Sequence, residues 1–252
     1  MRFLQQTFKC LVALFATAVA GQAAAQGVGC RPAVRDGVNF VICVFNPARS
    51  DIRLFWRDDR GDSYGVFDRL ADSVAGQGGR LLFAMNAGMF QPDLTPVGLY
   101  IEKGQELHPL NRRGGQGNFN LRPNGIFWVR QGVAGVTETQ KFIAQNLRPD
   151  YATQSGPMLT IGGRIHPKIH ADGTSAKIRN GVGVCEDGLV RFAISDDPVT
   201  FFAFASLFLE MKCPDALYLD GSISALYAPA LKRNDGWKSI GPIVGVVEGL
   251  KK

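Results

Sequence analysis

The sequence predicts an α+β fold in a single domain, with a mainly antiparallel or mixed β-sheet and a few flanking helices. Apolar runs of strand length follow one another with short glycine-containing turns between them, which is the pattern of hairpins. Helical patterns between consecutive strands, which would indicate parallel βαβ units, are rare. With 252 residues and 46% hydrophobic residues, the chain can bury one sizeable core.

The first 25 residues have the pattern of a cleaved export signal. Arg2 and Lys9 precede an apolar run over 10–20, and an A-x-A cleavage pattern follows at 23–25. The run is shorter than the roughly 20 apolar residues that span a bilayer. We therefore expect a signal peptide, a mature domain over residues 26–252, and a periplasmic or secreted protein without stable membrane insertion.

Four cysteines remain after this signal, and an even number in an exported chain predicts two disulfides. Three pairings are open; proximity along the chain favours Cys30–Cys43, which would close an N-terminal hairpin, and Cys185–Cys213. No C-x-x-C or closely spaced Cys/His pair indicates a metal site. Lipidation of Cys30 is an alternative, but Gly27-Val28-Gly29 is a poor match to the residues that precede a lipidated cysteine.

The strands begin with a meander in which the turn-like segment 46–50 separates two runs of strand composition. Three further hairpins are expected around the turns 102–105, 162–163 and 186–188, each of which contains glycine. In chain order, the expected strands are 37–46, 51–57, one ending at 86, 97–101, 106–110, one starting after 125, 158–161, 164–165, 183–185, 189–194, 216–219 and 240–247.

One clear helix is predicted over Pro198–Met211. Proline suits the first helical turn, and Ser195, Asp196 or Asp197 could cap it. Its apolar residues recur at helical spacing and predict a face buried against a sheet; they are Phe201, Phe204, Ala205, Phe208 and Leu209. The segment 67–74 is a short helix or a loop.

The charge pattern bears on the partners. Cleavage of the signal would lower the net charge from +6 to +4, and no run of Lys or Arg resembles a nucleic-acid-binding arm. A modest basic excess suits an anionic substrate or an envelope polymer, or simply a solubilising surface. We expect no nucleic-acid partner.

Five strand-like runs meet a small polar cluster built around glycine. Glycine lets the backbone turn sharply or approach a ligand closely, so the polar side chain beside it would be presented at a rim. Five such clusters with different polar chemistry predict one shared pocket. They lie at 83–88, 122–129, 154–159, 179–183 and 216–222, and their principal side chains are Asn86, Asn124, Gln154, Arg179 and Asp220.

In this order the clusters resemble the phosphodiester glycosidase family. The matching motifs are N-x-G-x-F at 86–90, N-G-x-F at 124–127, Q-x-G-P-x-L at 154–159, R-x-x-x-G at 179–183 and L-D-G-x-x-S at 219–224. The resemblance covers about residues 81–247. Ser222 stands where the commoner pattern has a second glycine, and the length is similar to that of the compact bacterial exported branch, which is sometimes linked with exopolysaccharide.

The resemblance implies a hydrolase of glycosyl phosphodiesters or related envelope glycans, with a carbohydrate or sugar-phosphate substrate. It singles out Asp220 as the base that activates water or as the nucleophile. Arg179 would clamp phosphate, because a guanidinium offers a bidentate fork. The amides of Asn86, Asn124 and Gln154 would bind sugar or phosphate oxygens or cap their own turns, and we expect at least one to be purely structural. The set of substrate-binding candidates is completed by Ser155 and Ser222.

Two other functions stay open. A non-catalytic glycan- or phosphoglycan-binding protein is one, because the sequence identifies no second catalytic carboxyl group. A Ser155-dependent esterase is the weaker one, because the G-x-S-x-G elbow is absent. His166 and His170 would form a metal pair on a helix, but Pro167 makes a helix there improbable. We predict no cofactor and no protein metal site, although a divalent cation could bridge Asp220 and phosphate.

Overall fold

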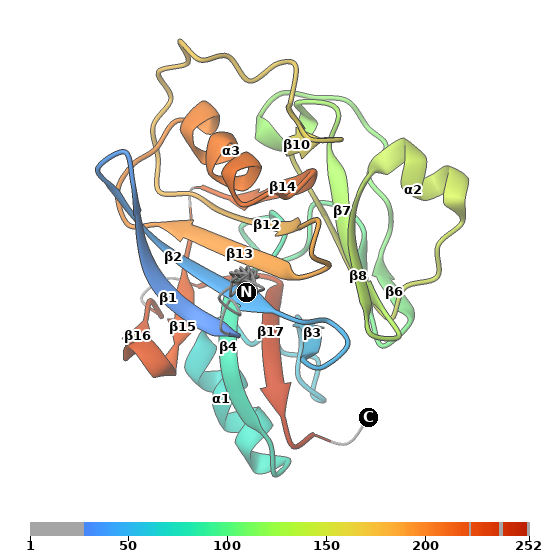
Figure 1. The fold of residues 1–252 in the computed structure, drawn as a ribbon. Helices are drawn as coiled ribbons and strands as arrows, with labels where there is room; N and C mark the ends of the chain where they lie inside the picture. Colours follow the sequence, from blue (N-terminus) through green and yellow to red (C-terminus); the bar gives the residue numbers. More distant parts are fainter. Residues whose placement is uncertain (1–27, 222, 237–238, 251–252) are drawn as a thin grey trace, which may run out of the picture.

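The computed structural model describes residues 28–221, 223–236 and 239–250. The predicted signal peptide and Ser222 therefore lie outside the described residues. The described chain folds into three mostly antiparallel sheets with three α-helices on their outer faces (Figure 1). This confirms the predicted α+β class with mainly antiparallel pairing.

The first sheet has seven strands in the order β1-β2-β13-β12-β14-β10-β11, and helix α3 (Phe201–Glu210) packs on its outer face. The bounds of its strands are β1 Gly29–Arg35, β2 Val38–Phe45, β10 Met158–Ile161, β11 Arg164–Ile165, β12 Asn180–Val184, β13 Val190–Ser195 and β14 Asp215–Asp220.

The second sheet has the order β16-β15-β4-β17-β3 and is covered by α1 (Phe67–Gly76). Its strands are β3 Asp51–Phe55, β4 Arg80–Asn86, β15 Leu226–Ala228, β16 Arg233–Asn234 and β17 Ile243–Glu248. A 3₁₀ turn, η2 (Pro229–Leu231), joins β15 to β16.

The third sheet has the order β6-β5-β9-β7-β8 and is covered by α2 (Thr139–Gln145). Its strands are β5 Tyr100–Glu102, β6 Gln105–His108, β7 Gly125–Arg130, β8 Val133–Glu138 and β9 Tyr151–Ser155. The 3₁₀ turn η1 (Asn118–Asn120) precedes β7.

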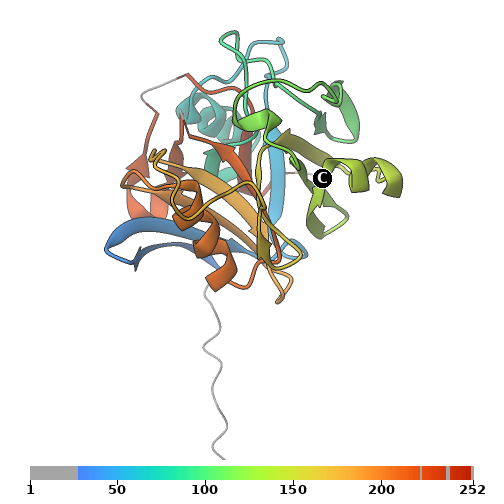
Figure 2. The ribbon, with the colours of Figure 1, turned by 90° about the horizontal axis from the view of Figure 1, so that it is seen from above.

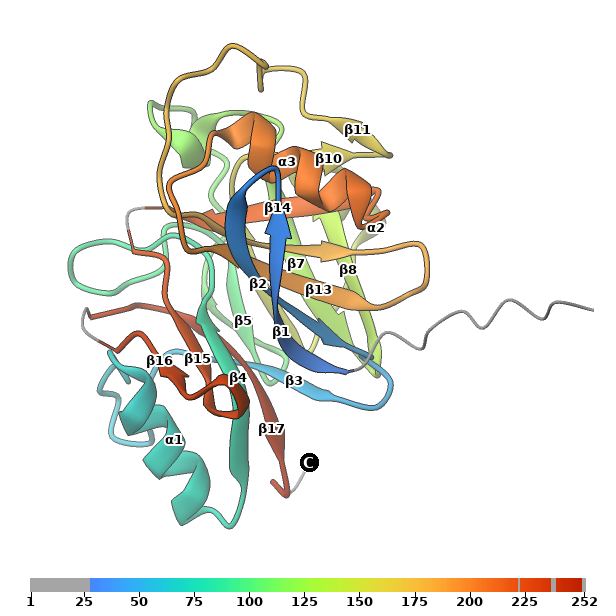
Figure 3. The same cartoon turned by 60° about the vertical axis from the view of Figure 1, so that its left-hand side comes forward.

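The main hydrophobic core lies where the inner faces of the three sheets meet (Figures 2 and 3). Phe192 of β13 contacts both Phe83 of β4 and Phe127 of β7 there, with its ring centroid 4.9 Å from that of Phe83 and 5.7 Å from that of Phe127. Burial of each such ring contributes about 1.5–3 kcal/mol. One core therefore holds all three sheets in a fixed relation.

Strand β2 shows why several strands read as unbroken apolar runs. Val41, Cys43 and Phe45 face the main core, whereas the alternate residues face the smaller core under α3. A strand buried on both faces needs apolar residues at every position.

Two disulfides tie the first sheet together, with the pairing that chain proximity favours. Cys30 and Cys43 face each other across the β1–β2 hairpin. Cys185 follows β12, and its bond to Cys213 fixes the connection that leads from α3 into β14.

The sequence analysis missed several elements and misplaced the start of one helix. It did not predict strands β8, β9, β15 and β16. It also did not predict helix α2, which starts where the Glu138 carboxylate accepts hydrogen bonds from two backbone N–H groups. Helix α3 begins at Phe201 and is capped by Thr200, not by Ser195, Asp196 or Asp197. The reason is that Val199 pairs with Lys177 as an isolated β-bridge, which keeps the chain extended past Pro198.

None of the helices in the described ranges is long and apolar enough to cross a membrane.

Candidate functional site

The polar clusters meet at the junction of the three sheets. Asn180 lies opposite Asp220 in the β12–β14 ladder of the first sheet, and Gly125 lies opposite Ser155 in the β7–β9 ladder of the third. The Ser155 hydroxyl donates to the carbonyl of Leu219 at 2.9 Å, which joins these two sheets. The strand ends that carry the motifs therefore occupy one region.

The residues that follow β4, a strand of the second sheet, contact β9 of the third sheet. The backbone N–H of Gly88 donates to Thr153 Oγ1 at 3.2 Å. A Cβ atom on Gly88 would lie 2.5 Å from that oxygen and 2.6 Å from the carbonyl oxygen of Gln154. Glycine is required here because the chain passes directly against β9.

Asn180 connects the strand ends and was not assigned a role by the sequence analysis. Its side-chain Nδ2 donates to the Asn86 carbonyl at 2.9 Å and to Asn86 Oδ1 at 3.0 Å. Its Oδ1 accepts from the Asp220 N–H at 2.8 Å and from Ser224 Oγ at 3.4 Å. The signal for it was present in the Arg179-Asn180-Gly181 cluster, where the alternation of a strand turns the arginine and the asparagine to opposite faces.

Asp220 ends β14 just after an irregularity in the ladder. The pairing with β12 shifts register between Asn180 and Gly181, so Leu219 is an extra residue ahead of Asp220. Such bulges re-aim the side chains next to them. Asp220 Oδ1 accepts from the N–H of Gly221 at 2.5 Å and of Ile223 at 3.4 Å, and the residue is 9% exposed. Its carboxylate is thus held in a fixed orientation, and the residue is largely buried.

The Asn86 side chain has an NH2 group that is unpaired within the described part of the chain. Its Oδ1 accepts from Asn180 and from the N–H of Ala225 at 2.9 Å, which fixes the orientation of the amide. Its Nδ2 is buried and has no hydrogen-bond partner among the described residues. A buried donor left unpaired costs about 1–3 kcal/mol. An oxygen of a bound ligand would remove that cost.

The Arg179 side chain is completely buried. Its Nε donates to the carbonyl of Val199 at 2.8 Å, its Nη2 to that of Ser175 at 2.7 Å, and its Nη1 to Tyr218 Oη at 3.1 Å. The guanidinium carbon lies 3.6 Å from the ring centroid of Phe201. Burial lowers the pKa of Arg179 from its ordinary value, but an arginine stays charged at neutral pH. The guanidinium group therefore lies on the opposite face of the start of β12 from Asn180, enclosed by protein groups.

Tyr218 lies between Arg179 and the turn after Asp220 and contacts both. A Cβ atom on Gly221 would overlap the Tyr218 hydroxyl oxygen and lie 3.0 Å from Tyr218 Cζ. The turn can therefore pass the tyrosine only as glycine. Burial is the main cause that raises the pKa of Tyr218, so its hydroxyl is protonated and can hydrogen-bond.

Asn124 and Gln154 hold loops in place. Asn124 Nδ2 donates to the carbonyl of Phe119 at 3.0 Å, and its Oδ1 accepts from Thr139 Oγ1 at 2.8 Å. Gln154 exchanges hydrogen bonds with the backbone of Asn111, of 2.9 Å to Oε1 and 3.0 Å from Nε2. Both side chains are buried, and these bonds position the segments around the strand ends.

The remaining candidates are placed as follows. Ser155 is fully buried, and among the described residues no histidine hydrogen-bonds to it. His166 is also buried, and its Nδ1 accepts from the N–H of Lys168 at 3.1 Å, whereas its Nε2 has no partner in the described ranges. Desolvation lowers the pKa of His166. No group of three or more His, Cys, Asp or Glu side chains in the described part of the chain could hold a metal ion.

Comparisons with known proteins identify relatives of this chain. A family model described as phosphodiester glycosidase matches residues 79–246. The uncharacterized protein YigE of Escherichia coli K12 is 37% identical over 183 residues, which are 72% of this chain and 71% of YigE.

Solved structures show the same fold. The catalytic domain of zebrafish N-acetylglucosamine-1-phosphodiester alpha-N-acetylglucosaminidase, auto-inhibited by its pro-peptide, superposes with a TM-score of 0.61 at 15% identity, over 90% of this chain and 83% of that one. A hypothetical protein from Synechocystis gives 0.57 at 14% identity, over 87% and 61%. A protein of Burkholderia pseudomallei K96243 that is described as exported gives 0.53 at 9% identity, over 83% and 74%.

Proposed function

Because the chain belongs to the phosphodiester glycosidase family, we propose that it is an exported hydrolase of glycosyl phosphodiesters or related envelope and exopolysaccharide glycans, with Asp220 as the reactive carboxylate. Family membership supports a glycosidase-type hydrolase with a carbohydrate substrate. The observation that carries the finer proposal is the hydrogen-bonded set Asn86, Asn180 and Asp220 at the three-sheet junction. The two disulfides suit export, because such bonds persist in oxidising compartments.

The chemistry of such a bond matches a site built around one carboxylate. Cleavage passes through an oxocarbenium-like transition state, and a phosphate monoester is a good leaving group with little need of a strong general acid. Asp220 would either activate water or attack the anomeric carbon, and both roles start from the ionised carboxylate. The zebrafish protein is named for hydrolysis of a sugar phosphodiester, which supports the same bond type here.

In this proposal Asn86 supplies a hydrogen-bond donor to the ligand. Its Nδ2 would donate to a phosphate or sugar oxygen, and Asn180 holds it in that orientation. A preorganised donor stabilises developing charge without having to reorient during the reaction.

Arg179 acts indirectly in this proposal. A direct bidentate clamp would require its guanidinium to give up the bonds to Ser175 and Val199. Instead, its positive charge would favour binding of an anionic substrate without direct contact. Its hydrogen bond to Tyr218 would hold the turn after Asp220 in place. An indirect role predicts that Tyr218→Phe and Arg179→Lys lower kcat similarly with little change in KM. A direct clamp predicts a raised KM for Arg179→Lys and near-normal kinetics for Tyr218→Phe.

Asp220→Asn tests the central assignment. With methyl N-acetylglucosamine 1-phosphate and glucose-based analogues as substrates, release of reducing sugar should fall by about 10²–10⁴-fold, while the urea unfolding curve stays close to that of the wild type. Asp59→Asn, which changes an exposed aspartate in a turn, is the matched control and should keep full turnover.

Near-normal turnover by Asp220→Asn would refute the assignment. Calorimetric binding of these saccharides with no product after long incubation would favour the non-catalytic binding protein. Labelling of Ser155 by a fluorophosphonate would favour the esterase.

A further inference from the structure

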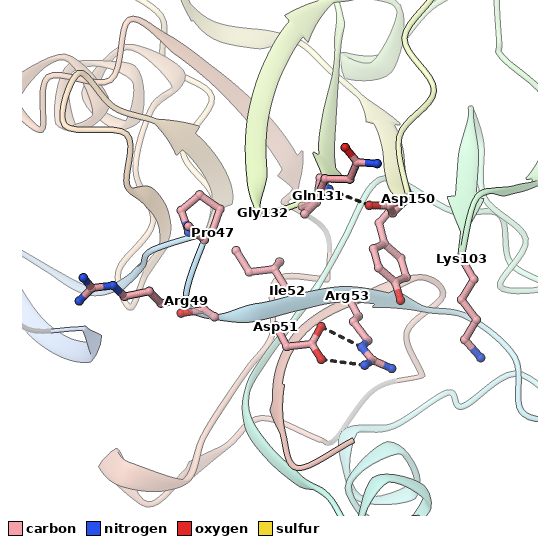
Figure 4. Close-up of a pocket in the computed structure, with 13 residues that line it drawn as sticks. Pro47, Arg49, Asp51, Ile52, Arg53, Lys103, Gln131, Gly132 and Asp150 are labelled. Carbon is pink, nitrogen blue, oxygen red and sulfur yellow. Dashed lines mark hydrogen bonds and ion pairs between the residues drawn. The ribbon is translucent and has the colours of Figure 1, made fainter. Parts of the chain in front are cut away.

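A cavity of about 520 Å³ is lined by residues that do not belong to the candidate active site (Figure 4). It is bounded by β3, by the turn before β3 and by the β7–β8 turn. In the β7–β9 ladder, Val129 pairs with Tyr151 at the cavity end, whereas Gly125 pairs with Ser155 at the end near Asp220. The cavity is therefore separated from the reactive carboxylate by the length of these strands, and its size is that of small-molecule sites.

The polar groups of the cavity are held in fixed positions. Arg53 donates to both carboxylate oxygens of Asp51, at 2.9 and 2.7 Å, and is only 9% exposed. The Asp150 carboxylate accepts from the N–H of Gln131 at 2.8 Å. Gln131 and Gly132 have φ values of 48° and 79°, which set the β7–β8 turn over the cavity. Ionised groups fixed in this way form strong hydrogen bonds to hydroxyl groups.

The cavity also has an apolar and aromatic wall. Ile52 and Val129 are buried, and Tyr151 is partly exposed. Desolvation is the main cause that raises the pKa of Tyr151 to about 12, so its hydroxyl stays protonated at neutral pH and can both donate and accept. An aromatic ring with a polar tip suits a ligand that has apolar faces and polar edges.

The charges that line the cavity nearly balance. Arg53 is paired with Asp51, and Lys103 and Asp150 carry opposite charges on the remaining wall. Arg49 also lines the cavity and leaves one cation in excess, and its side chain points away from Ile52 (Figure 4). The two carboxylates disfavour a strongly anionic ligand, because Asp51 and Asp150 would repel it. A ring with many hydroxyl groups and no net charge fits these walls.

We infer that this cavity binds a neutral saccharide and is an accessory glycan site, distinct from the site at Asp220. The inference goes beyond the proposed function, because it assigns a second binding site and depends on none of the catalytic residues. In a polymer substrate it would hold sugar units remote from the cleaved bond.

Protein-observed NMR with maltotriose, cellotriose and chitotriose tests the inference. At least one trisaccharide should bind with a Kd of about 1 mM or tighter and shift the amide signals of Gln131 and Gly132. Tyr151→Ala should weaken binding by about tenfold or more and Asp150→Asn by about threefold. Tyr151→Phe keeps the packing of the ring and should therefore lose less binding affinity than Tyr151→Ala.

The controls separate this site from the active site. Asp59→Asn should leave binding unchanged, and Asp220→Asn should keep the shifts at Gln131 and Gly132 even though turnover is lost. No shift there at roughly 10 mM of any trisaccharide, equal binding by Tyr151→Ala, or tighter binding of trigalacturonate than of every neutral trisaccharide would overturn the inference. A failure of Asp220→Asn to lose activity would count against the proposed function alone.

Discussion

Gly221→Ala should be the most damaging small substitution near Asp220. The added methyl group would overlap Tyr218 Oη and lie 3.0 Å from Cζ. Tyr218 is fully buried, and its hydroxyl accepts from Arg179 Nη1 at 3.1 Å. The ring can move aside only if this bond breaks. Because the φ angle of Gly221 is not positive, the effect is steric and not conformational.

The expected cost follows from these contacts. Overpacking of a tight site costs about 1–3 kcal/mol, and loss of a hydrogen bond to a charged group costs about 1.5–3 kcal/mol. We therefore expect Gly221→Ala to lower the free energy of unfolding by about 3–5 kcal/mol, a large part of the roughly 5–15 kcal/mol of a typical domain. In the Tyr218→Phe background the overlapping oxygen is gone, so the same substitution should cost only about 1 kcal/mol.

A double-mutant cycle measures this coupling. Urea unfolding of the wild type, both single variants and the double variant should give a coupling energy of at least about 2 kcal/mol. The turnover of Gly221→Ala, corrected for the folded fraction, should also fall, because the turn that orients the Asp220 carboxylate moves. If Gly221→Ala costs the same in both backgrounds within about 0.5 kcal/mol, Tyr218 is not the obstacle and the reasoning is wrong.

Two further predictions concern stability. The pKa of His166 is lowered in the folded state, so below its unfolded pKa of about 6.5 the unfolded chain takes up a proton that the folded protein resists, and stability falls as the pH falls. When the pH is lowered from about 7.5 to 5, the urea concentration at the midpoint of unfolding should therefore fall less for His166→Asn than for the wild type. An equal fall in both proteins would contradict this. The two disulfides span 28 residues for Cys185–Cys213 and 13 for Cys30–Cys43. Replacement of the first pair by serine should destabilise more than that of the second, by about 0.7 kcal/mol from loop entropy; the reverse order in urea unfolding would show that native contacts dominate.

Much of the fold was predictable because it is encoded locally. Apolar runs on both sides of glycine predict hairpins such as β10–β11. Burial on both faces explains why β2 is mostly apolar. Helix α2 escaped detection because it is short, and the start of α3 was misplaced because Val199 pairs with Lys177, a residue distant in sequence.

The polar clusters were likewise predictable in part from local sequence. The sequence alone indicated that five glycine-marked strand ends belong together. Together with the family resemblance it ranked Asp220 first among them, and this ranking stays a prediction. It could not say which polar side chains face a ligand, because that depends on hydrogen bonds between strands far apart in the chain. Asn180 became the connecting residue through its contacts with Asn86 and Asp220. Arg179 is enclosed by protein groups because its side chain donates hydrogen bonds to Val199, Ser175 and Tyr218.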